Sequence, residues 1–229
     1  MSDRLNDPAR DRGTAWPPRT AEQYRAEAVQ VLGEELATAF GRVKCLVFDC
    51  DGVLTAGNLI YGPEGEALKE FHSHDGLGLV IARIAGLKRA VLTGRNSSIV
   101  ERRCTELRFD SIKLGRFDKR QALEEIWQET GCGPTDTLYM GDDLIDLPAM
   151  HQVFLPVTVP GAPAEVTEHC RYQTRAIGGH GAVREITDLV LKAGGLYTVG
   201  LRRLLEKSWQ PTRKELSSDQ DLDPGELTQ

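Results

Sequence analysis

The chain has 229 residues, a length that suits one catalytic-size domain with additional segments at its ends. Its formal net charge of −6 argues against nucleic acid or an anionic membrane as the main partner, because both need a concentrated basic surface. No apolar run approaches the roughly 20 residues that span a bilayer, and the polar N-terminus is unlike a signal peptide. We therefore expect a cytoplasmic protein.

The ends of the chain differ in composition from its middle. Residues 1–19 are rich in Asp, Arg and Pro and predict a disordered arm. Apolar residues then recur every four positions and predict one amphipathic N-terminal helix over 20–41. We expect a single catalytic-size domain over 42–195, a terminal helix over 196–209 and a disordered acidic tail over 210–229.

The stretch from Val43 to Thr55 joins an apolar run to two carboxylates. Residues 43–48 are typical of a central strand that is covered on both faces, and Asp49 and Asp51 follow at once. Open α/β sheets bind their ligands at this end of a strand, and adjacent carboxylates repel each other unless a cation or a proton intervenes. A Mg²⁺ site is therefore the leading hypothesis, with a plain acidic turn as the alternative.

Short strands and helices alternate along the rest of the chain. Two extended segments, 59–61 and 67–71, flank a Gly-Pro-Glu-Gly turn and predict a β-hairpin. Further strands are expected over 88–92, 111–114, 137–140 and 153–159, and helices over 77–85, 97–107, 118–130, after Pro163 and up to Leu191. This alternation predicts an α/β fold with a doubly wound, mostly parallel, Rossmann-like sheet.

The five cysteines are an odd number without C-x-x-C spacing, so the sequence predicts neither a disulfide framework nor a zinc site. Cys50 stands between the two carboxylates of the acidic turn. Alternation along an extended segment points it away from them, so we expect a buried residue rather than a catalytic thiol.

Polar groups follow several of the predicted strands. After the acidic pair come Thr93, Lys119 at the start of a helix, and the cluster Asp142, Asp143 and Asp146. Together they supply a nucleophile, a metal site, groups that bind equatorial oxygens and a proton donor. These are the requirements of phosphoryl transfer.

The first two carboxylates receive different roles in this hypothesis. Asp49 attacks phosphorus and forms an aspartyl-phosphate, and Asp51 protonates the leaving alcohol and then activates water. Asp142 completes the metal site with Asp49 and the main-chain carbonyl of Asp51.

The remaining groups support the reaction. Asp143 and Asp146 bind the metal through water or orient their neighbours. The Thr93 hydroxyl and the Lys119 ammonium hold the phosphoryl oxygens. The structural alternatives are a plain Thr-Gly turn and a solvated lysine at a helix start.

In this order the groups resemble the four motifs of the haloacid dehalogenase superfamily, over about residues 43–191. The gaps between the motifs cannot hold a cap domain. The sequence is most similar to the capless 3-deoxy-D-manno-octulosonate 8-phosphate phosphatases, in D-G-V-L-T, G-E-A-L-K-E-F, D-G-L-G, T-G-R, G-D-D-L-I-D and G-G-H-G-A-V-R-E-I.

This resemblance implies a Mg²⁺-dependent phosphatase for a small sugar-acid phosphate, above all 3-deoxy-D-manno-octulosonate 8-phosphate, as used in lipopolysaccharide biosynthesis. It also implies a homotetramer whose hairpins pack together, with a Gly-rich segment of a neighbour over each site. The alternatives are a phosphatase for a nine-carbon or other sugar-acid phosphate and a non-catalytic sugar-phosphate-binding scaffold subunit. A receiver domain does not fit, because its phosphoacceptor lies on a later strand than its acidic pair.

The resemblance also places the substrate. Guanidinium groups suit the carboxylate of a sugar acid, although Arg103 could instead lie on an exposed helix face. Nine-carbon relatives tend to have Glu where this chain has Arg95. The expected substrate-binding residues are His72, His74, Asp75, Gly76, Gly94, Arg95, Arg103, Lys119 and His180.

Three of these positions depart from the family pattern. The family usually has Asn-Val-Arg where this chain has His72-Ser73-His74, and an arginine where it has His180. A further arginine is replaced by Val80. These departures bear on the exact sugar acid and leave the hydrolytic chemistry unchanged.

Overall fold

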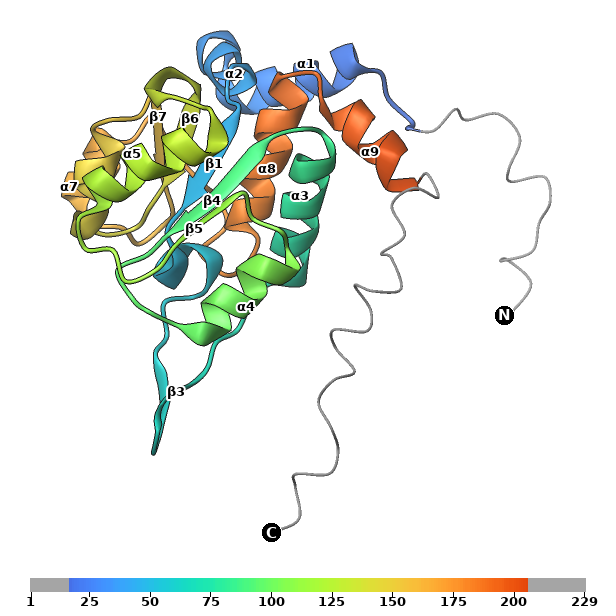
Figure 1. Cartoon of the computed structure of the whole chain (residues 1–229). Helices are drawn as coiled ribbons and strands as arrows, with labels where there is room; N and C mark the ends of the chain where they lie inside the picture. Colours follow the sequence, from blue (N-terminus) through green and yellow to red (C-terminus); the bar gives the residue numbers. More distant parts are fainter. Residues whose placement is uncertain (1–16, 206–229) are drawn as a thin grey trace, which may run out of the picture.

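Strand β1 (Cys45–Phe48) lies in the middle of a six-stranded sheet (Figure 1). The computed structural model describes residues 17–205. The other strands of the sheet are β4 (Lys88–Leu92), β5 (Ser111–Lys113), β6 (Thr137–Met140), β7 (Leu155–Thr158) and β8 (Tyr172–Gln173). Their order is β5-β4-β1-β6-β7-β8, and all neighbours are parallel. The predicted parallel sheet is confirmed, and the two-residue β8 is an addition to it.

Helices cover both faces of this sheet, which explains why every residue of β1 is buried. Leu46 and Phe48 belong to the core on one face, and Cys45 and Val47 to the core on the other. The first face carries α3 (Ser73–Ile84), α4 (Ser98–Glu106) and α8 (Ala182–Ala193), and the second carries α5 (Lys119–Thr130), α6 (Leu147–Met150) and α7 (Ala164–His169). Short turns lie at Cys50–Leu54, Pro134–Asp136 and Leu144–Asp146. Figure 1 shows α5 and α7 on one side of β1, and α3 and α8 on the other.

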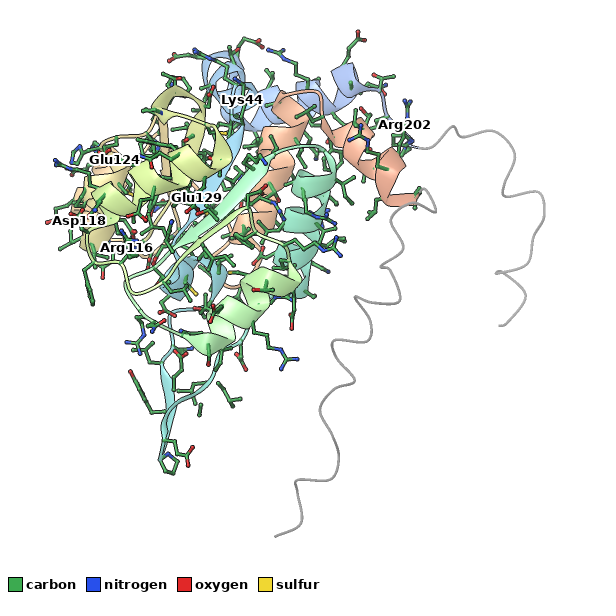
Figure 2. The ribbon with its side chains drawn as sticks, in the orientation of Figure 1. Lys44, Arg116, Asp118, Glu124, Glu129 and Arg202 are labelled. Carbon is green, nitrogen blue, oxygen red and sulfur yellow. The ribbon has the colours of Figure 1, made fainter. Side chains whose placement is uncertain are left out.

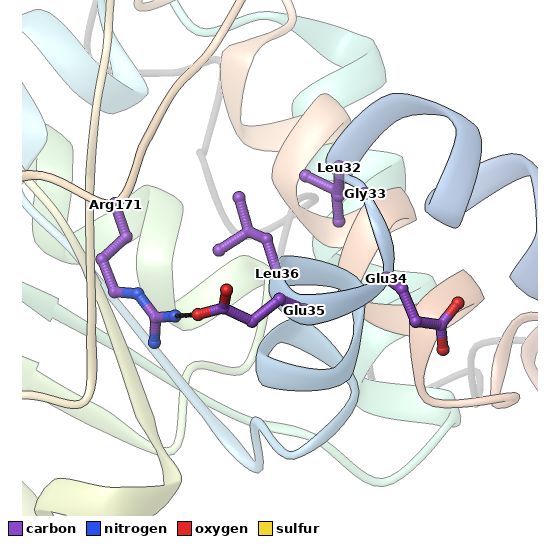
Figure 3. Close-up of a pocket in the computed structure, with 6 residues that line it drawn as sticks. All are labelled: Leu32, Gly33, Glu34, Glu35, Leu36 and Arg171. Atoms are coloured by element: carbon purple, nitrogen blue, oxygen red, sulfur yellow. Dashed lines mark ion pairs between the residues drawn. The ribbon is translucent and has the colours of Figure 1, made fainter.

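The segment before the sheet is two helices, α1 (Ala21–Leu32) and α2 (Glu34–Gly41), so the expectation of one helix over 20–41 is wrong. The break is at Gly33, whose φ of 75° is open to glycine at little cost. Both helices pack against α8. A surface hollow at the break is shown in Figure 3. It is lined by Leu32, Gly33, Glu34, Glu35, Leu36 and Arg171.

This hollow is remote from the acidic turn. Helix α2 leads directly into the amino end of β1, whereas Asp49 and Asp51 follow its carboxyl end. Arg171 lies 3.6 Å from Glu35 across the hollow, with both side chains at the surface.

At the other end of the chain, α9 (Tyr197–Leu205) packs against α3. It falls within the predicted terminal helix, whose last residues, 206–209, lie outside the described residues. Most of the predicted arm and the whole predicted tail also lie outside them. No helix within residues 17–205 is long and apolar enough to cross a membrane.

Strands β2 (Ile60–Gly62) and β3 (Gly65–Leu68) form the predicted antiparallel hairpin, which projects from the body of the molecule (Figure 1). No cap domain is present among the residues that the structure describes, as predicted.

Helix α3 starts at Ser73, four positions before the start expected at 77. Its first turns hold Gly76 and Gly78, which weaken a helical pattern in sequence. The structure explains why glycine occupies these two helical positions. A Cβ at either position would crowd a neighbouring helix, Arg103 of α4 at 76 and Thr187 of α8 at 78.

Candidate active site

The carboxylate of Asp49 lies at the carboxyl end of β1 and is paired with Lys119. Asp49 is 6% exposed and Lys119 is 1% exposed. Lys119 donates to Asp49 Oδ1 at 2.7 Å and to Asp146 Oδ1 at 2.6 Å. This lysine begins α5, so a helix from one face of the sheet delivers its charge to the end of the central strand. It is a buried ion rather than a solvated helix-start lysine.

Asp146 is fully buried, and both of its oxygens are occupied. Oδ1 accepts from Lys119 and from the Tyr139 hydroxyl at 2.7 Å, and Oδ2 accepts from the backbone N–H groups of Asp142 and Asp143 at 3.0 and 3.2 Å. Asp146 therefore orients Lys119 and the loop that carries Asp142. Tyr139 of β6, which the sequence did not single out, fixes the Asp146 carboxylate through this hydrogen bond.

Asp142 faces the acidic turn from the neighbouring strand β6. A Cβ at Gly52 would overlap the Asp142 carboxylate, so the turn and this side chain are in close contact. Asp49, Asp142 and Asp146 each offer an oxygen within 4.8 Å of the others. Within residues 17–205 no hydrogen bond or ion pair to the Asp142 carboxylate is found, whereas Asp146 has no spare oxygen.

The electrostatics of this cluster are those of a cation site. Burial, followed by repulsion from Asp49 and Asp146, raises the pKa of Asp142 to about 7. Burial raises the pKa of Asp49 to about 6, against the opposing charge of Lys119. One buried and one half-buried carboxylate that resist ionisation together need positive charge beyond Lys119. Oxygen donors of this type suit Mg²⁺, so the residues fit the expected metal.

Asp51, the second carboxylate, is contacted by one cation from the hairpin and approached by another from the Thr-Gly-Arg motif. Lys69, just after β3, forms an ion pair with its Oδ1, and Arg95 Nε lies 3.6 Å from its Oδ2. The Thr55 hydroxyl lies 3.4 Å from Oδ1. Sequence reasoning assigned no role to Lys69. Its signal was weak, a single cation between Glu66 and Glu70 in a hairpin strand.

Thr93 directly follows β4 and is 3% exposed. Its hydroxyl oxygen accepts from the backbone N–H of Arg95 at 3.3 Å. The side chains of Phe117 and Ile145 flank Gly94, each 3.6 Å from where a Cβ would lie. Arg95 reaches the hairpin, where its Nη2 donates to the Tyr61 hydroxyl at 2.5 Å.

The structure gathers the three histidines of the predicted substrate site. The ring of His72 lies 5.1 Å from that of His74 and 6.5 Å from that of His180, measured between centroids. Asp75 accepts from the backbone N–H groups of Gly181 and Arg184 at 3.2 and 2.7 Å. Asp75 therefore ties the start of α3 to the start of α8 and so brings the histidines together.

Arg103 projects from α4 toward the same helix start. Its guanidinium contacts Gly76, lies 5.8 Å from the centre of the Phe71 ring and is 3.4 Å from Glu106. The side chain is 28% exposed, so the fully exposed helix face considered from sequence does not describe it.

The Gly-rich loop before α8 touches the acidic turn. A Cβ at Gly178 would overlap the carbonyl oxygen of Gly52, and Gly179 donates its backbone N–H to the Val53 carbonyl at 2.9 Å. The turn is thus braced by a segment from the far end of the domain.

Comparison with known proteins gives consistent similarities. The sequence profile of the haloacid dehalogenase-like hydrolases matches residues 109–186. The chain is 37% identical over 174 residues to the 3-deoxy-D-manno-octulosonate 8-phosphate phosphatase of Escherichia coli K12, which covers 71% of this chain and 93% of that protein.

Solved structures agree with this similarity. One is the enzyme of the same name from Moraxella catarrhalis, in complex with magnesium, phosphate and a KDO molecule. It has a TM-score of 0.69 and 36% identity over 72% of this chain and 95% of that one. The cobalt-bound enzyme of Haemophilus influenzae has a TM-score of 0.67 and 38% identity over 69% of this chain and 92% of that one.

Proposed function

Because the chain belongs to the family of 3-deoxy-D-manno-octulosonate 8-phosphate phosphatases, we propose that it hydrolyses 3-deoxy-D-manno-octulosonate 8-phosphate in a Mg²⁺-dependent reaction. The observation that carries the proposal is the buried contact of Lys119 with Asp49 and Asp146, next to the Asp142 carboxylate, which has no hydrogen bond or ion pair within the described part of the chain. This arrangement combines a nucleophile, a fixed cation and oxygen ligands for a metal.

In the proposed mechanism Asp49 attacks phosphorus with a carboxylate oxygen and forms an acyl-phosphate. The bond from phosphorus to the sugar oxygen breaks, and Asp51 gives its proton to that oxygen. Asp51 then takes a proton from the water that attacks the acyl-phosphate, which releases phosphate and restores Asp49. Lys119 and the Thr93 hydroxyl hold the phosphoryl oxygens throughout.

Asp49, Asp142 and the main-chain carbonyl of Asp51 would hold the Mg²⁺ ion, with Asp143 and Asp146 supporting them. When bound, the ion supplies positive charge to the phosphoryl oxygens and to the carboxylates. The raised pKa of Asp142, which comes first from burial and then from neighbouring carboxylates, supports this role.

The sugar acid would lie between the hairpin and the starts of α3 and α8. We propose that Arg95, Arg103 and a histidine cluster bind its carboxylate and hydroxyl groups. The cluster comprises His72, His74 and His180. It stands where the family pattern has guanidinium groups. Gly94 would leave room for the chain of the sugar, Gly76 admits the Arg103 guanidinium beside the start of α3, and Asp75 fixes the helix starts. The proximity of the three imidazole rings supports this assignment.

The proposal includes a homotetramer in which hairpins pack together. Exposed apolar side chains on the hairpin support it, since a surface of this kind favours association. The exposed set comprises Leu59, Ile60, Tyr61 and Leu68.

We also propose a cytoplasmic location and a phosphatase domain over 42–195. The five cysteines are all free, as is usual in reducing compartments.

A panel of phosphate esters tests the function. The purified protein is assayed for phosphate release with and without Mg²⁺, on eight-carbon and nine-carbon sugar-acid phosphates and on unrelated sugar phosphates. We expect the highest kcat/KM for the eight-carbon acid. Preference for a nine-carbon acid would favour the second candidate, and binding without turnover would favour the scaffold subunit. Turnover of unrelated phosphates, without turnover of any sugar-acid phosphate, would contradict the proposed substrate.

A further inference from the structure

Lys69 is a buried cation of the hairpin that contacts Asp51, the expected proton carrier. Its side chain is 1% exposed, although the last two residues of the strand before it, Ala67 and Leu68, are exposed. The ammonium forms ion pairs with Asp51 Oδ1 and, at 3.1 Å, with Glu66 Oε1. Two carboxylates in direct contact with the buried ammonium favour its charged form. It is therefore a fixed charge.

Glu66 ties this contact to the rest of the site. Its carboxylate accepts a hydrogen bond from the Ser97 hydroxyl. Ser97 also caps α4, because its hydroxyl oxygen accepts a hydrogen bond from the backbone N–H of Val100 at 3.3 Å. The chain of contacts therefore runs from α4 through Glu66 and Lys69 to Asp51. The hairpin is joined to the catalytic turn by buried charges as well as by the backbone.

The chemistry of Lys69 limits where Asp51 can carry a proton. An ammonium group has three donors and no acceptor, so it can bind only an oxygen without hydrogen. While Lys69 occupies Oδ1, the proton of Asp51 is confined to Oδ2. Arg95 Nε, 3.6 Å from Oδ2, is beyond hydrogen-bond distance and leaves that oxygen available.

We propose that Lys69 is a positioning residue for proton transfer. It fixes Asp51 through Oδ1, so that Oδ2 gives the proton to the leaving sugar oxygen and later takes one from water. Since the hairpin supplies Lys69, a displaced hairpin leaves Asp51 unoriented. This inference rests on the proposed phosphatase function and adds a residue to it.

The test uses leaving groups that differ in their need for a proton. An alkyl phosphate, with 3-deoxy-D-manno-octulosonate 8-phosphate as the first choice, must be protonated as it leaves, whereas p-nitrophenolate leaves readily without a proton. In Lys69→Met we expect kcat for the alkyl ester to fall by about 10²-fold. With p-nitrophenyl phosphate, the rate of the initial burst of p-nitrophenolate should fall by less than about tenfold. The KM for each ester should be nearly unchanged. Lys69→Arg should recover part of the loss.

The matched control is Lys44→Met, which removes an exposed lysine at the other end of β1 (Figure 2). Its activity on both esters should equal that of the natural chain. If Lys69→Met does not fold, Glu66→Gln, which keeps the ammonium but removes its second anchor, should show the same selective loss to a smaller extent.

Equal losses on both esters, or a higher KM with unchanged kcat, would overturn the positioning role. The first result would mean that Lys69 is structural, and the second that it binds substrate. The natural chain is assayed first. If it hydrolyses other alkyl phosphates but not the sugar acid, the proposed substrate fails while the comparison of leaving groups proceeds with glycerol phosphate.

Discussion

The Lys119 ammonium lies 2.7 Å from Asp49 Oδ1, and both groups are almost completely buried. One cation from α5 thus serves the expected nucleophile and, through Asp146, the loop that carries Asp142. The proposed nucleophile and the proposed metal-binding loop are coupled through a single side chain.

Replacing Lys119 with Met leaves two buried carboxylates without their cation. We expect the free energy of unfolding to fall by about 3–5 kcal/mol, because a buried charge that loses its partner is strongly unfavourable. Urea unfolding measures the loss. Lys113→Met, which breaks partly exposed pairs with Glu125 and Glu129, should cost less than about 1 kcal/mol. Adding Asp146→Asn to Lys119→Met should restore part of the stability, and a strictly additive double variant would contradict the coupling.

Asp49→Asn should abolish turnover and leave the fold intact. An amide of the same size cannot act as the nucleophile, so we expect kcat to fall by at least about 10³-fold. The metal-free variant should melt no lower than the natural chain, because one of the mutually repelling carboxylates is gone. Asp136→Asn, at the opposite end of the sheet, is the control and should keep full activity. Unchanged turnover in Asp49→Asn would rule out the covalent mechanism.

Stability should respond to pH and Mg²⁺ in a linked way. The pKa values of Asp49 and Asp142, about 6 and about 7, are raised chiefly by burial and exceed those of unfolded carboxyl groups. Their contribution to stability is therefore full at low pH and is lost as pH rises through these values. Mg²⁺ binds the ionised carboxylates, so its stabilising effect should increase over the same range.

Thermal melting at pH 5, 6, 7 and 8, with Mg²⁺ or with EDTA, measures this effect. The increase in Tm caused by Mg²⁺ should be smallest at pH 5 and largest at pH 8. An increase that is the same at every pH would contradict the assignment of these carboxylates to the metal. Asp142→Asn should reduce the increase at pH 8.

The histidine cluster should control substrate affinity. His180→Ala is expected to raise KM for the sugar acid by about tenfold, equivalent to about 1.4 kcal/mol, with kcat within about twofold. His151→Ala, whose ring contacts His169 away from the site, serves as the control. A KM that is unaffected by His180→Ala would remove the cluster from the substrate site.

Charge on the hairpin should disrupt the proposed tetramer. Leu68 is 62% exposed in the single chain, so Leu68→Glu should cost little in folding but should oppose hairpin packing between subunits. Light scattering should show a smaller mass for the variant than for the natural chain. A natural chain that is monomeric and fully active would contradict the proposed assembly.

Particular residues show what the sequence could predict. The end of β1 was predictable because a buried, partly β-branched run changes abruptly to carboxylates, and Lys119 because its place at a helix start follows the motif order. Contacts between distant segments have no such local signal. The pairing of Lys69 with Asp51 and the support of Asp146 by Tyr139 arise only when the hairpin and the sheet fold.

The break at Gly33 was hidden for another reason. The apolar spacing of residues 20–41 continues across it, so periodicity alone predicts an unbroken helix. The positive φ of one glycine divides the pattern. The two-residue β8 and the four-residue α6 are too short to produce any periodicity.

The contact of Gly178 and Gly179 with the acidic turn also determines when the site forms during synthesis. The turn emerges from the ribosome early, but the loop that braces it is translated only near the end of the domain. A nascent chain therefore carries Asp49 and Asp51 for most of its synthesis without the loop that completes the site. The site is complete only when the last part of the domain has emerged and folded against the first.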